Sequence, residues 1–247
     1  MNTPDRIYSL PNLRFTQWLV DPGRNVPPDI RVALVGGLFG SLPIFFGGII
    51  NTLLVAALIT LRRPEPLFFL WLGLEALVCA SRIVVLVSAR RLALTGRPTP
   101  TDLYVVLALG WAGSVGYGTF ISLTSGDWIA ATLACLSAAS MVGGICVRNF
   151  GAPRLSAVMV ALSVGPCVLA ALFTQEPIFW LVLVQVPLYM TSMSMASYRL
   201  NRMLVSTMLA ERENERQARQ DSLTGLLNRY GPVSYTHLRA HETLRYL

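Results

Sequence analysis

The sequence of 247 residues contains no lysine, so all 20 of its basic residues are arginines. We interpret this as the codon usage of a GC-rich genome and not as a functional feature, because solvated surfaces normally carry both residue types. Charged residues are also scarce, at 13%, whereas 53% of the residues are hydrophobic. This balance excludes an ordinary soluble domain and predicts a membrane protein.

Residues that bind metals are equally scarce. The two histidines lie four positions apart in the C-terminal tail, without the further ligands that a zinc site needs. The four cysteines fall inside apolar stretches with no metal-ligand spacing: Cys79, Cys135, Cys146 and Cys167. We therefore expect packed thiols and no metal site.

The first 31 residues lack the short apolar core and the cleavage site of a secretory signal, and they hold four arginines. We expect residues 1–31 to be a cytoplasmic segment that contains a short interfacial helix. Leu13, Phe15 and Trp18 give that helix its apolar side, and the turn sequence Asp21-Pro22-Gly23 ends it.

Apolar stretches long enough to cross a bilayer, about 20 residues each, recur through residues 32–197. Charges, prolines or glycines bound each of them. The predicted spans are residues 32–61, 67–87, 103–123, 128–147, 155–173 and 178–196. The first is longer than a bilayer requires and rich in glycine, so we expect it to tilt or to begin in the interface.

The distribution of arginines predicts the orientation in the lipid bilayer. An even number of spans puts both termini on one side, and that side collects most of the arginines, as cytoplasmic segments do. Because these arginines lie in short loops and polar ends, the net charge of +7 does not predict a nucleic-acid partner. Both termini are predicted to be cytoplasmic, although Arg62 and Arg63 on the opposite side contradict the rule locally.

Two ionisable residues, Glu75 and Arg82, lie seven positions apart inside the second span and therefore on one helical face. Ionisable groups at such depth often mark a ligand or proton site, so the pair is a candidate intramembrane sensing site. In the alternative interpretation, which we favour, Arg82 reaches the cytoplasmic headgroups and Glu75 is neutral or hydrogen-bonded to a neighbour.

Residues 198–220 form a polar continuation of the last span. Pairs such as Glu213 and Arg216, one turn apart, favour a helix. Two interpretations remain open. The segment is either a solvated linker helix or a signalling helix that pairs with its copy in a dimer.

The linker leads into a nine-residue motif that carries the functional prediction. Its residues 221–229 read Asp-Ser-Leu-Thr-Gly-Leu-Leu-Asn-Arg, which resembles the Asp-x-Leu-Thr-Gly-Leu-x-Asn-Arg sequence that opens GGDEF domains. The matching positions are Asp221, Leu223, Thr224, Gly225, Leu226, Asn228 and Arg229. The resemblance covers about a dozen residues, 221–232, and we expect them to be a structural coupling joint in which Asp221 caps the next helix.

This resemblance implies a diguanylate cyclase, an enzyme that joins two GTP molecules into cyclic di-GMP with the help of magnesium. It also implies a homodimer, because two such domains each deliver one GTP. The residues that hold metal and nucleotide in that family lie farther along than this sequence extends. We therefore expect no catalytic, cofactor-binding or metal-binding residue here, and GTP and magnesium only in a full-length parent.

The last residues, 233–247, do not continue the motif. Residues 233–243 resemble a translated sequencing adapter, so we treat the tail as an artefact that follows a truncated gene. His241, Glu242 and Arg245 are spaced differently from a histidine-kinase phosphoacceptor box.

Taken as a whole, the sequence predicts an all-α membrane protein. We expect a six-helix transmembrane bundle, a cytoplasmic linker helix and the first turn of a truncated α/β GGDEF domain. The function predicted is the sensor or anchor of a diguanylate cyclase in a bacterial inner membrane. The alternatives are a six-span transporter or channel, and the membrane anchor of a degenerate GGDEF protein.

Overall fold

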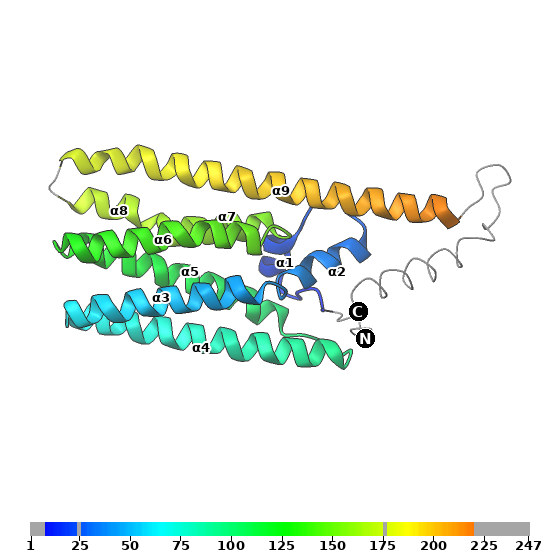
Figure 1. Ribbon diagram of the computed structural model, residues 1–247, viewed down its shortest axis with the longest axis horizontal. Coiled ribbons are helices and arrows are strands. Elements are labelled where there is room, and N and C mark those ends of the chain that lie inside the picture. Colours follow the sequence, from blue (N-terminus) through cyan, green and yellow to red (C-terminus); the bar gives the residue numbers. More distant parts are fainter. Residues whose placement is uncertain (1–7, 24–25, 175–176, 220–247) are drawn as a thin grey trace, which may run out of the picture. The chain divides into compact units, whose positions relative to one another are not determined.

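The computed structural model describes residues 8–23, 26–174 and 177–219 (Figure 1). Helices make up nearly all of these segments, and no strand occurs within them. In chain order they are α1 (Arg14–Val20), α2 (Pro28–Gly37), α3 (Leu42–Arg62), α4 (Pro66–Leu94), α5 (Thr101–Thr124), α6 (Trp128–Arg148), α7 (Pro153–Val164), α8 (Pro166–Phe173), the 3₁₀-helix η1 (Pro177–Leu181) and α9 (Val182–Arg219).

Six stretches of the described chain are helical, long and apolar enough to cross a membrane, which confirms the multi-pass architecture predicted from the sequence. They are α3, α4, α5, α6, the segment Pro153–Phe173 that contains α7 and α8, and the segment Pro177–Gln217 that contains most of α9. Each overlaps one predicted span. Several extend farther than predicted, because polar residues such as Arg90 and Arg91 continue a helix after its apolar stretch has ended.

The predicted start of the first span, at residue 32, is wrong by ten residues. The apolar stretch from residue 32 to residue 61 is split into α2 and α3 by a turn at residues 38–41, and the span begins at Leu42. Pro43, which has no N–H to donate, stands in the first turn of α3, and Gly36, Gly37 and Gly40 surround the break. Apolar residues on both sides of the turn hide it from a hydropathy profile.

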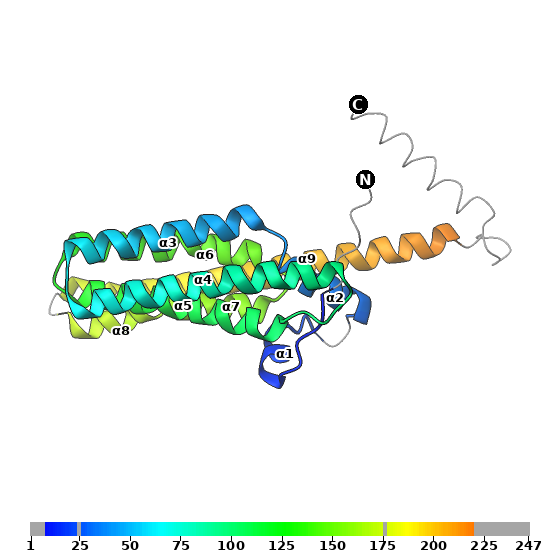
Figure 2. The ribbon, with the colours of Figure 1, turned by 90° about the horizontal axis from the view of Figure 1, so that it is seen from below.

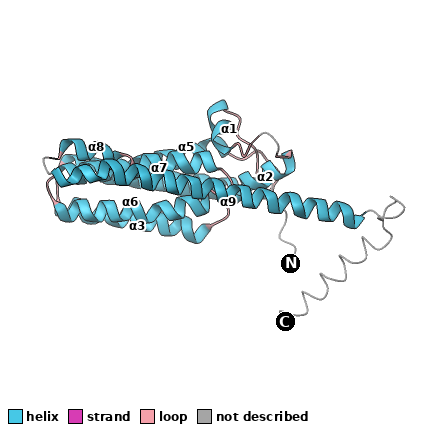
Figure 3. Cartoon of the chain, turned by 90° about the horizontal axis from the view of Figure 1, so that it is seen from above, coloured by secondary structure: helices cyan, strands magenta, loops and turns pink. Residues whose placement is uncertain are grey.

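Helices α3 to α8 run side by side, as the views in Figures 1, 2 and 3 agree. We call the end at which α3, α5 and α7 begin the Arg148 end, and the opposite end the Asp127 end. Helix α5 packs against α4, α6, α7 and α8, and 61% of its most apolar window is buried, more than in any other span. It is therefore the central helix of the bundle.

A glycine and a proline allow α5 to approach the fifth span closely. Pro166 separates α7 from α8 and has no N–H for the carbonyl of Leu162, four residues earlier. That carbonyl faces Gly116 of α5, where an added Cβ would lie 2.0 Å from the Leu162 oxygen and 2.9 Å from Cγ of Pro166. Gly116 is thus required by packing and not by backbone conformation.

Helix α1 is attached to the Arg148 end of the bundle by polar contacts. Asp102, in the first turn of α5, accepts hydrogen bonds from the backbone N–H groups of Asn12 and Leu13 and from the hydroxyl of Thr16. Leu13, Phe15 and Trp18 remain half exposed. An apolar side left open at a bundle end is what the predicted interfacial helix requires, and the helix itself is confirmed.

The chain divides into two compact units, residues 1–201 and residues 202–247. Within the first unit, the α9 residues 182–201 have apolar side chains that are exposed or half-buried, and some of them, such as Val186 and Met193, pack against the core. The fully buried residues of this stretch are Ser197 and Asn201. The amide of Asn201 donates to the carbonyl of Phe150, at 2.9 Å. In the second unit the predicted pair of Glu213 and Arg216 is present, at 2.9 Å.

We predict that Gly116→Ala destabilises the bundle. The new Cβ meets backbone, which cannot rotate away, and overpacking of this kind costs about 1–3 kcal/mol. The thermal midpoint of the purified protein in detergent should fall by several degrees, measured by a maleimide dye that reacts with Cys79, Cys146 and Cys167 as they become exposed. Gly113→Ala is the matched control, because its Cβ would meet nothing within 4 Å. Equal midpoints for the two variants would contradict the proposed packing.

Candidate functional site

The break between α2 and α3 leaves the carbonyls of Leu38, Phe39 and Gly40 without helical partners. Arginines from two other helices bind these carbonyls, and one of them also binds the Ser41 carbonyl, which accepts from the Phe45 N–H as well. Arg148, in the last turn of α6, donates to the carbonyls of Leu38 and Ser41 at 3.0 and 2.8 Å. Arg90 of α4 donates to those of Phe39 and Gly40, at 2.7 and 3.1 Å. Because an unpaired carbonyl away from water is costly, these bonds stabilise the break inside the bundle.

Arg148 is buried, with 6% of its surface exposed, and Tyr104 of α5 completes its surroundings. The Tyr104 hydroxyl donates to the Leu38 carbonyl at 3.0 Å and accepts from the Arg148 guanidinium. The guanidinium also lies 4.6 Å from the centre of the Phe45 ring. Hydrogen bonds and an aromatic face together compensate for the burial of this cation.

Arg82 of α4 lies beside the same ring and is also buried, with 4% exposed. Its guanidinium carbon is 5.0 Å from the centre of Phe45 and 4.7 Å from that of Trp111. Its Nε is buried without a hydrogen-bond partner. The favoured interpretation of the sequence, in which Arg82 reaches outward to the headgroups, is therefore wrong.

Arg82 and Arg148 line one cavity of about 30 Å³ between α3, α4, α5, α6 and α7. Phe45 and Trp111 form part of its wall, and Asn149 lies next to Arg148. No acidic side chain of the described residues lines it. The site is therefore small, cationic and partly aromatic.

Glu75 is fully buried, but it is not the counter-ion of Arg82. Its Oε1 accepts a weak hydrogen bond from the Cys79 thiol at 3.5 Å, and its Oε2 has no partner among the described residues. Seven residues of helix separate their Cα atoms by about 10 Å along the axis, and no ion pair joins the two side chains in the described part of the chain. The two residues that the sequence marked as one candidate site thus occupy different surroundings, and Glu75 does not line the cavity.

Sequence reasoning missed Arg148 as a member of this site. Arg148 directly follows a predicted span, where arginines usually lie in loops. No neighbouring residue in the sequence indicates that Tyr104 and Phe45 surround it. The motif positions Asp221, Leu223, Thr224, Gly225, Leu226, Asn228 and Arg229 lie outside the described residues. Within the described part of the chain, no group of three or more His, Cys, Asp or Glu side chains could hold a metal ion.

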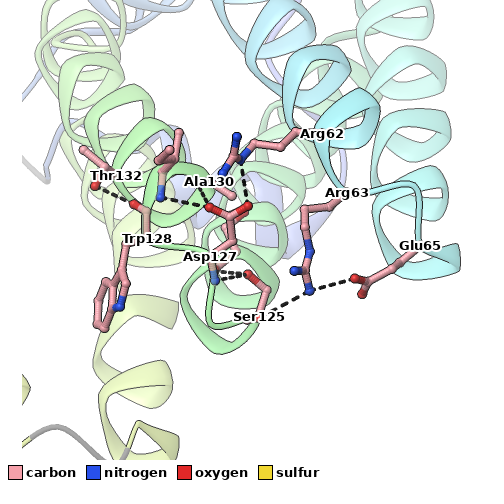
Figure 4. A network of polar contacts seen from close by, with 10 residues as sticks. Arg62, Arg63, Glu65, Ser125, Asp127, Trp128, Ala130 and Thr132 are labelled. Atoms are coloured by element: carbon pink, nitrogen blue, oxygen red, sulfur yellow. Dashed lines mark hydrogen bonds and ion pairs between the residues drawn. The ribbon is translucent and has the colours of Figure 1, made fainter.

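The Asp127 end carries a second polar network (Figure 4). Asp127 caps α6 by accepting from the N–H groups of Ile129 and Ala130, and it pairs with Arg62 at 2.7 Å. Arg63 pairs with Glu65 at 2.7 Å and donates to the Ser125 carbonyl. The two arginines that contradicted the charge rule are thus matched by carboxylates at the same end of the bundle.

No protein-family model matches the chain, and neither a curated protein nor a solved structure shows significant similarity to it.

We predict that the Arg62–Asp127 pair contributes to stability at neutral pH and not in acid. The Arg62 guanidinium and the N–H groups of Ala130 and Ile129 hold the pKa of the Asp127 carboxyl below its usual range. The stabilisation is therefore complete above the unfolded pKa, about 3.9, and is lost as the pH falls through the lower folded pKa. Asp127→Asn keeps the cap, since both residues cap well, but removes the charge.

At pH 7 this variant should lower the thermal midpoint by about 2–4 °C, in line with an ion pair whose arginine is half exposed. The difference from the natural chain should be smaller at pH 3 than at pH 7. Arg62→Gln should have the same effect, and the double variant should add nothing further. A loss that is the same at both pH values would show that the charge is not responsible.

Proposed function

We propose that the chain is the membrane sensor or anchor region of a diguanylate cyclase. The observation that carries the proposal is the sequence of residues 221–229, which matches the opening motif of GGDEF domains at every fixed position. The bundle supports it by supplying a membrane-embedded part. Helix α9, which is described as far as Arg219, supports it by continuing from an apolar into a polar stretch directly before the motif.

The proposed orientation has both termini on the cytoplasmic side of a bacterial inner membrane. Six candidate spans return the chain to the side on which it began. Unpaired positive charge favours the Arg148 end, where Arg90, Arg91 and Arg97 lie, because Arg62 and Arg63 at the other end are matched by Asp127 and Glu65. The charge rule then agrees with the topology at both ends.

The proposed parent is a homodimer that joins through its membrane and linker helices. A cyclase of this family needs two GTP-bearing domains face to face, and a shared membrane bundle would raise their effective concentration. Helix α9 supports this arrangement, because Leu188, Met195 and Leu200 are exposed on it. These side chains are free to contact lipid or a second copy.

Disulfide crosslinking in membranes tests the dimer. We predict that Leu200→Cys, placed on the exposed surface of α9, forms a covalent dimer on mild oxidation. Leu77→Cys is the matched control, since Leu77 is also exposed but lies on α4, and it should remain monomeric. Monomers alone from Leu200→Cys and neighbouring α9 positions, in membranes where the full-length parent keeps its cyclase activity, would reject the proposed dimer.

Synthesis of cyclic di-GMP tests the enzyme. We predict that the purified chain, given GTP and magnesium, forms no cyclic dinucleotide, because the family's nucleotide-binding turn is not among its residues. A parent gene that continues the reading frame past Gly231 should form it, and replacing the acidic residues of its Gly-Gly-Asp/Glu-Glu-Phe turn should abolish product. Chromatography with mass detection measures both. Product from the chain itself, or a different domain after residue 231, would overturn the assignment.

A transporter is less well supported. Transporters of the repeat type carry interrupted helices at corresponding positions of two halves. Here the described spans with an internal proline are the fifth, at Pro166, and the sixth, at Pro187, which are neighbours.

A further inference from the structure

Two buried cations share one small cavity within the bundle. Arg82 comes from α4 and Arg148 from α6, and at least 94% of each residue is buried. Both guanidinium carbons lie against the ring of Phe45, at 5.0 and 4.6 Å, so their separation cannot exceed the sum of these distances. Like charges this close repel each other strongly where little water screens them.

The described residues balance only part of this charge. The donors of Arg148 bind the carbonyls of Leu38 and Ser41 and the Tyr104 hydroxyl. Arg82 has two aromatic faces but a buried Nε without an acceptor. Among the described residues no carboxylate lines the cavity. Glu75 acts on Arg82 electrostatically, but it accepts its hydrogen bond from Cys79 and not from the guanidinium. The missing component is therefore a hydrogen-bond acceptor with negative charge.

The size of the cavity limits what that acceptor can be. About 30 Å³ accommodates one or two water-sized particles. Nucleotides, amino acids and lipid headgroups are far larger. A halide, or an oxyanion no larger than nitrate, is the class of anion that fits.

We infer that this cavity binds one small monovalent inorganic anion of about the size of chloride. The anion accepts from Arg82 and balances one of the two cations, while Arg148 stays bound to the α2–α3 break. The inference is independent of the proposed cyclase function, because it concerns only the bundle.

A thermal-shift titration tests the site. The purified chain in detergent is titrated with sodium chloride against sodium gluconate at constant ionic strength, since gluconate has the same charge but exceeds the cavity. We expect a saturable rise of the thermal midpoint with chloride, on the order of 5–10 °C at a hundredfold excess over Kd. Arg82→Gln should abolish the rise. This variant is preferred to one at Arg148, whose loss would also remove three hydrogen bonds at the α2–α3 break.

Arg97→Gln is the matched control, because it removes the same charge from an exposed position and should titrate like the natural chain. No specific rise with chloride in the natural chain, or an equal rise in Arg82→Gln, would overturn the inference. Equilibrium dialysis with radioactive chloride provides a measurement on the natural chain alone, in case Arg82→Gln does not fold. It should find one chloride per chain, displaced by bromide and not by gluconate, and no retained chloride would equally reject the site.

Discussion

The pairing of backbone carbonyls at the α2–α3 break is the constraint on which the rest of the bundle depends. Carbonyls that leave a helix and are removed from water need donors from elsewhere in the protein. Here they come from Arg90, Arg148 and Tyr104 on three different helices. The same bonds bring Arg148 inside the bundle beside Phe45, and so bring a second cation close to Arg82.

Hydropathy predicted the six spans because each crossing needs a long apolar stretch, and this requirement is local to the sequence. It failed at residue 32 because a turn between apolar residues leaves hydropathy unchanged. Pro43 and the three glycines around the break were the available signal, but glycine and proline also occur within spans, as Pro187 does. Only the tertiary donors determine that the chain bends at residues 38–41.

The candidate site was partly visible in the sequence for a similar reason. Glu75 and Arg82 stand out because charge is rare in an apolar stretch, and both are buried. Their surroundings could not be predicted, because Phe45, Trp111 and Arg148 come from helices far away in the sequence. Asp127 could be predicted as a cap from its place before α6, but its pairing with Arg62 depends on how α3 and α6 pack. The motif at residues 221–229 differs from these residues, because its functional meaning comes from its resemblance to GGDEF domains and not from its physical surroundings.

The attachment of α9 has a mechanical consequence. Its buried residues within the first unit are polar, and the bond from Asn201 to the Phe150 carbonyl joins it to the turn that follows Asn149 in the wall of the cavity. A hydrogen bond is directional and short in range, so it is either made or broken, whereas an apolar contact can slide gradually. Val186, Tyr189 and Met193 of the same helix also pack against the core, so the apolar contacts hold α9 to the bundle while the hydrogen bond at Asn201 fixes its register.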